Sequence, residues 1–131
     1  MSDFVWAALS GWAGVLMFAS TFCLPFLMRR MRSKKPYLKR LWPHYWLGYA
    51  LLAAALTHAW MSMRRGDMRG LSMAGLWLAT GALFLIMWQV SVGLLLRVPE
   101  QGGRRALRRT HFWSMLLIGA LLAAHIVLNR P

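Results

Sequence analysis

Four histidines form two pairs with the same spacing. His44 and His58 occupy positions i and i+14, and so do His111 and His125. In an α-helix, this interval returns a side chain to within roughly 40° of its starting direction and about 21 Å further along the axis. Imidazole is a common metal ligand. The spacing therefore predicts two metal-ligating rings on one face of each helix, at two depths.

Four uncharged apolar runs supply the elements that would carry these histidines. Each run reaches the roughly 17–20 residues that a helix needs to cross a bilayer. The runs are continuously apolar rather than alternating, which favours helices over barrel strands, and short loops favour antiparallel neighbours. The sequence thus predicts an all-α fold, a four-helix transmembrane bundle formed by one domain over 1–131. Its spans are 4–28, 44–63, 73–96 and 111–128.

The charge distribution predicts a membrane location and an orientation. The chain has 16 Lys and Arg against three Asp and Glu. Because the basic residues cluster between the apolar runs, we expect membrane lipid as a partner and no nucleic acid. Twelve of the basic residues lie in the first and third loops, and four lie in the second loop and the C-terminus. The positive-inside rule then places loops one and three in the cytoplasm and both termini outside, in an integral protein of a bacterial inner membrane.

The second and fourth runs are separated by one hairpin and therefore run in the same direction. If they face each other, His44 meets His111 near the cytoplasmic surface, and His58 meets His125 near the outer surface. Zinc needs three or four protein ligands, and the spans hold no Asp or Glu to complete such a set. Haem iron needs two axial ligands, because the porphyrin supplies the other four. The inventory therefore predicts two stacked, non-covalent haem b groups, each held by two histidines.

Basic and small residues near the histidines suit this prediction. Small residues in the first and third runs would let a flat macrocycle approach closely. Arginines can pair with propionate carboxylates bidentately. The basic residues closest in sequence to the histidines are Lys39, Arg40, Arg108 and Arg109 for the inner pair, and Arg64 and Arg65 for His58.

The histidine spacing resembles the diheme core of the membrane cytochromes b, above all cytochrome b of the bc complexes. The membrane domains of ferric reductases and NADPH oxidases are similar. The resemblance covers nearly the whole chain. It implies that the four histidines are axial ligands and that the function is transmembrane electron transfer, as a subunit or partner of a larger redox system.

The chain also departs from that family. The later helices and the Pro-Glu-Trp-Tyr motif of the quinol site are missing. Ala79 and Gly93 stand at the same i, i+14 interval as the histidines, but the run 4–28 has no glycine pair at that spacing. The resemblance therefore implies a quinone as a partner but identifies no quinone-binding residues in this chain.

Two other functions fit parts of the sequence. One is a self-sufficient membrane oxidoreductase acting on quinone or superoxide; an electron-transfer protein is preferred over this enzyme. The other is a pigment-binding or structural subunit, with one imidazole for each chlorophyll magnesium. For the remaining side chains we expect an interhelical hydrogen bond from Gln89 rather than contact with a quinone or haem edge, a buried Cys23, and internal packing of Trp12, Trp77 and Trp88.

Overall fold

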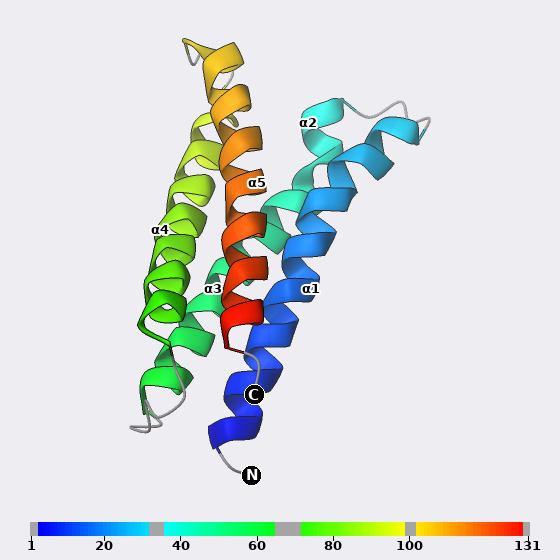
Figure 1. The fold of residues 1–131 in the computed structure, drawn as a ribbon. Helices are drawn as coiled ribbons and strands as arrows, with labels where there is room; N and C mark the ends of the chain where they lie inside the picture. Colours follow the sequence, from blue (N-terminus) through cyan, green and yellow to red (C-terminus); the bar gives the residue numbers. More distant parts are fainter. Residues whose placement is uncertain (1–2, 32–35, 65–71, 99–101, 130–131) are drawn as a thin grey trace. The chain divides into compact units, whose positions relative to one another are not determined.

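The computed structural model describes residues 3–31, 36–64, 72–98 and 102–129, and the structural statements below refer to these residues (Figure 1). They form helices and no strands, which confirms the all-α prediction. The helices are α1 (Asp3–Arg30), α2 (Tyr37–Arg40), α3 (Trp42–Arg64), α4 (Met73–Leu95) and α5 (Arg104–Leu128).

The chain divides into two compact units, Met1–Arg65 and Gly66–Pro131. In the first unit α1 packs against α3, and in the second α4 packs against α5. Each unit is described by itself. The single four-helix domain expected from the sequence stays a prediction.

The predicted spans agree with the helices except at the start of α5. This helix begins at Arg104, about two turns before the expected start at 111. Hydropathy detects only the apolar part of a helix, and the first two turns of α5 are basic. Gly103 precedes the helix with a φ of 70°, a left-handed conformation that glycine adopts without steric cost. The short helix α2 was not predicted.

Three of the described helices are long and apolar enough to cross a membrane: α1 over Val5–Arg30, α4 and α5. Helix α3 is as long as α4 but is not among them, because its histidines, tyrosines, tryptophans and proline lower its average hydropathy. The fourth span therefore stays a prediction. Large apolar side chains such as Leu16, 68% exposed, lie on the outside of the helices, and such surfaces suit contact with lipid.

Within its own unit, none of Trp12, Trp77 and Trp88 is packed inside, so the expected packing of these side chains is not found there. These side chains are 61%, 71% and 54% exposed. Cys23 is exposed as well, contrary to expectation. In a pair of helices, each helix turns one stripe toward its neighbour, and long apolar runs place further large side chains on the remaining surface. Apolar character alone therefore did not identify which side of each helix packs against its neighbour.

An arginine side chain donates to carbonyls in or directly after the last turn of the first helix of each unit. The last four carbonyls of a helix have no partner within the helix. In the first unit, Arg40 Nη1 donates to the carbonyls of Met28 and Met31, both at 3.0 Å. In the second unit, Arg104 donates to the carbonyls of Leu96 at 3.0 Å and Val98 at 2.5 Å.

A polar network joins α4 to α5. Gln89 Nε2 donates to the carbonyl of His111 at 2.8 Å, and the Ser114 hydroxyl lies in hydrogen-bonding contact with Gln89 Oε1. The interhelical hydrogen bond expected from Gln89 is thus confirmed. Since both polar ends of the Gln89 amide have partners on α5, this residue holds the two helices together at the level of His111.

Replacing Gln89 by Leu should lower the free energy of unfolding by about 1 kcal/mol, because interhelical hydrogen bonds in membranes contribute about that much. Unfolding of the purified protein in mixed micelles, followed by circular dichroism, measures the change. Ser91→Ala is the control, because the Ser91 hydroxyl donates to Met87 within its own helix. Equal stability of the two variants would contradict the role of Gln89 in joining the helices.

Candidate functional site

His44 of α3 is held by a carbonyl of α1. Its Nδ1 lies 3.1 Å from the Thr21 carbonyl oxygen. A carbonyl can only accept a hydrogen bond, so Nδ1 carries the proton and Nε2 carries the lone pair that can ligate a metal. Pro25 follows Thr21 by four positions and has no backbone N–H. The helix therefore offers no i+4 donor to the Thr21 carbonyl, which serves the neighbouring helix instead.

His58 repeats this arrangement nearer the N-terminus of α1. Its Nδ1 lies 2.9 Å from the Ala7 carbonyl oxygen. Gly11 follows Ala7 by four positions, and the His58 ring packs against its backbone. A Cβ at position 11 would lie 3.0 Å from His58 Cε1 and 3.1 Å from Nδ1. These distances are shorter than ordinary contacts, so the position of the ring depends on a glycine there.

The two histidines of α5 lie against α4, and His125 makes the same ring-to-carbonyl contact as the histidines of α3. His125 Nδ1 lies 3.1 Å from the Gly75 carbonyl oxygen. His111 lies opposite Gln89, which bonds its backbone carbonyl. A Cβ at Gly93 would lie 3.7 Å from His111 Cε1, an ordinary van der Waals contact. The His111 ring therefore packs beside the backbone of Gly93.

The two units share one internal arrangement. In each unit, two histidines of one long helix (α3 or α5) face two residues of the other long helix (α1 or α4). On every one of these helices the two positions are related as i and i+14. In three facing pairs a ring Nδ1 meets a backbone carbonyl: Ala7 with His58, Thr21 with His44, and Gly75 with His125. In the fourth pair the Gln89 side chain donates to the backbone carbonyl of His111.

The residue four positions after each facing residue is small or is proline. These residues are Gly11, Pro25, Ala79 and Gly93. The sequence-based prediction included the pair Ala79 and Gly93 and counted Gly11 among the small residues, but it missed that Gly11 and Pro25 stand at the same i, i+14 interval. The signal was present in the sequence. The i, i+14 interval in α1 is recognised once proline is treated like glycine, as a residue that leaves the carbonyl four positions earlier accessible to a neighbouring ring.

The basic residues predicted to meet propionates lie at the helix ends. The Arg40 guanidinium contacts the end of α1, as described above. The side chains of Lys39, Arg64, Arg108 and Arg109 are exposed, and Arg65 lies outside the described residues. The structure thus gives Arg40 a capping role, and the propionate contacts stay a prediction.

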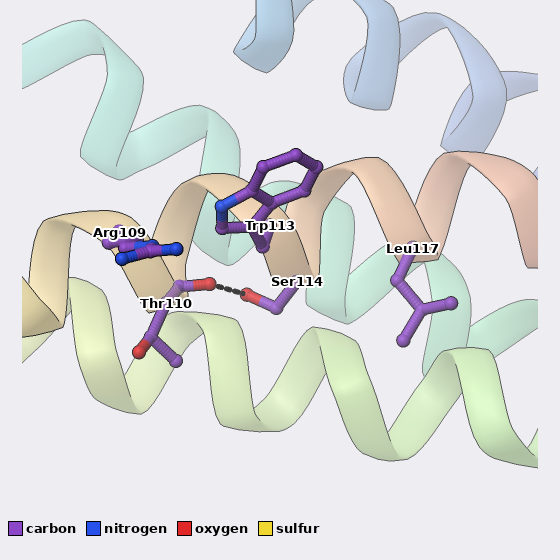
Figure 2. A pocket seen from close by; sticks show the side chains of 5 residues that line it. All are labelled: Arg109, Thr110, Trp113, Ser114 and Leu117. Atoms are coloured by element: carbon purple, nitrogen blue, oxygen red, sulfur yellow. Dashed lines mark hydrogen bonds between the residues drawn. The ribbon is translucent and has the colours of Figure 1, made fainter.

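A shallow hollow of about 400 Å³ lies on α5 and is separate from the histidines (Figure 2). Its lining runs along one face of the helix, with a cation at one end and apolar groups at the other. The residues are Arg109, Thr110, Trp113, Ser114 and Leu117. Within the described residues, no three His, Cys, Asp or Glu side chains are placed to hold a metal ion together.

No known protein family, curated protein or solved structure matches the chain. The resemblance to the diheme cytochromes b therefore stays a proposal, supported by the residues themselves.

Replacing Gly11 by Ala should displace the His58 ring and weaken its bond to the Ala7 carbonyl, because the added methyl group would overlap the ring. Gly14→Ala is the matched control, since a Cβ there meets nothing within 4 Å. Nitrogen-15 NMR of histidine-labelled protein measures the ring-nitrogen shifts. A His58 signal that responds equally to both variants would contradict the packing described here.

Replacing Pro25 by Ala should lower the fraction of His44 that carries its proton on Nδ1. The new N–H of residue 25 would donate to the Thr21 carbonyl and compete with the ring. One net hydrogen bond changes the ratio of the Nδ1–H to the Nε2–H tautomer by about two- to tenfold. The same NMR experiment measures this ratio. Pro43→Ala is the control, because Pro43 lies in the first turn of α3, where no intrahelical donor is needed. An unchanged His44 signal in the Pro25 variant would argue against the role of proline.

Proposed function

We propose that the chain is a diheme cytochrome b that carries electrons within a membrane. His44 and His111 would ligate one haem, and His58 and His125 the other. The observation that supports this most directly is the bond from Nδ1 of a histidine to a backbone carbonyl, seen for His44, His58 and His125. Metal-ligating histidines almost always donate their second ring N–H in this way.

The carbonyl bonds suit ligation of a metal for three reasons. For His44 and His58 they fix the tautomer in which Nε2 carries the lone pair, and for all three histidines they hold the ring against a neighbouring helix so that it does not rotate. They also increase the basicity of the ligating nitrogen, which stabilises the oxidised state of a bound iron. The Ala7, Thr21 and Gly75 carbonyls would therefore contribute to the reduction potential without touching the cofactor.

The haem held by two histidines would supply one-electron transfer rather than chemistry on a bound substrate. The protein would hold the ligating rings through backbone carbonyls, exclude water through its apolar spans, and place cations near the surfaces. Arg40, Arg64, Arg65 and Arg108 are the proposed partners of the propionates. The two levels of histidines, about 21 Å apart along a helix, would allow electrons to pass between the faces of the membrane, toward a quinone or a redox partner protein.

We further propose four spans in a bacterial inner membrane, with both termini outside and loops one and three in the cytoplasm. This orientation requires α3 to cross the bilayer. Three spans would place the termini on opposite sides. Twelve basic residues in the first and third loops support the four-span arrangement.

Protein purified in mild detergent from a haem-producing host should contain two haem b per chain. The measurement is a pyridine haemochrome assay together with the dithionite-reduced spectrum. His58→Ala should retain one haem, because the other pair of histidines is unchanged. Thr57→Ala is the control and should retain two, since Thr57 is exposed beside His58.

Other outcomes separate the alternatives. Absorption of red light without added reductant would indicate chlorophyll. Each histidine replacement should then remove one pigment, because one imidazole binds each magnesium. Rapid reduction of the purified chain by quinol alone would indicate a self-sufficient oxidoreductase. A folded wild-type protein that takes up no haem would overturn the proposal.

A further inference from the structure

His125 has a second contact at the ring nitrogen that faces the carbonyl. Asn129 ends α5, and its Nδ2 lies 3.1 Å from His125 Nδ1 and 2.8 Å from the His125 carbonyl oxygen. The contact with the His125 carbonyl oxygen shows that Nδ2 and not Oδ1 occupies this position, because two acceptor oxygens would repel each other. An N–H donor therefore points at the nitrogen that also faces the Gly75 carbonyl.

The two neighbours of His125 Nδ1 favour opposite tautomers. The Gly75 carbonyl, at 3.1 Å, favours a proton on Nδ1. The Asn129 amide, at the same distance, favours a lone pair on Nδ1 and hence a proton on Nε2. For His44 and His58, the Nδ1 contact given by the structure is a carbonyl oxygen.

The position of the amide depends on the absence of a side chain at residue 75. A Cβ on Gly75 would lie 2.6 Å from Asn129 Oδ1 and 2.9 Å from Cγ. Gly75 is buried, and its own N–H donates to Ser72 Oγ at 2.9 Å. The backbone of α4 is thus fixed at this point, and the amide packs directly on it.

We propose that Asn129 is a positioning residue that sets the tautomer of His125. By competing with the Gly75 carbonyl, it lowers the fraction of rings with the proton on Nδ1. If the function proposed above holds, a ring that binds iron through Nε2 carries its proton on Nδ1, so Asn129 disfavours the ligating tautomer and lowers the haem affinity of the site that His125 shares with His58.

The test uses the full chain without haem in detergent micelles, labelled with nitrogen-15 at histidine. Asn129→Ala should raise the ratio of the Nδ1–H to the Nε2–H tautomer of His125 by about two- to tenfold, the effect of one net hydrogen bond. Gly75→Ala should act in the same direction, because it displaces the amide and keeps the carbonyl. Ser62→Ala, four positions after His58, is the control and should leave both rings unchanged.

Ring-nitrogen shifts of His125 that are the same in wild type, Asn129→Ala and Gly75→Ala would overturn the proposal. The two alanine variants perturb different helices, so a folding defect in one leaves the other as a test. The haem affinity of the protein is a second readout and should rise by about two- to tenfold in Asn129→Ala. Failure of the haem proposal is distinguishable, because the tautomer shift is measured without haem and can occur even if none binds.

Discussion

The arrangement depends on a hydrogen bond between a histidine ring and a backbone carbonyl of the adjacent helix. Inside apolar helices such a bond satisfies the polar edge of an imidazole that would otherwise be costly to desolvate. It also selects one tautomer and one orientation of the ring. Helix packing and the chemistry of the site are therefore linked, since the bond from His58 to Ala7 that joins α3 to α1 also determines which ring nitrogen can bind a metal.

The carbonyls are accessible because of the residues that follow them. A helix carbonyl normally accepts a bond from the residue four positions later, whose side chain also covers it. Pro25 removes the donor, and Gly11 removes the side chain. The proline in α1 is thus compatible with a long helix because its cost is offset by a bond from another helix.

The helices could be predicted from hydropathy, and the four histidines could be selected as candidate ligands from one repeated spacing. These signals are strong because long apolar runs and a recurring interval between histidines are properties of the chain alone. The packed stripe could not be predicted, as the exposed Trp12, Trp77 and Trp88 show, because every face of such a helix is apolar. Asn129 was also missed, since a polar residue at the end of a helix is ordinary in composition and becomes specific only through its contact with His125.

The lower hydropathy of α3 bears on how the protein is made. A segment rich in imidazole, phenol and indole groups enters a bilayer less readily by itself than α1, α4 or α5. If α3 crosses the membrane, its insertion has to be assisted by α1, which is synthesised first and offers the Ala7 and Thr21 carbonyls to its rings. The same contacts that hold the imidazoles in the finished protein would then guide biogenesis, so that the hairpin and not the single helix is the unit released into lipid.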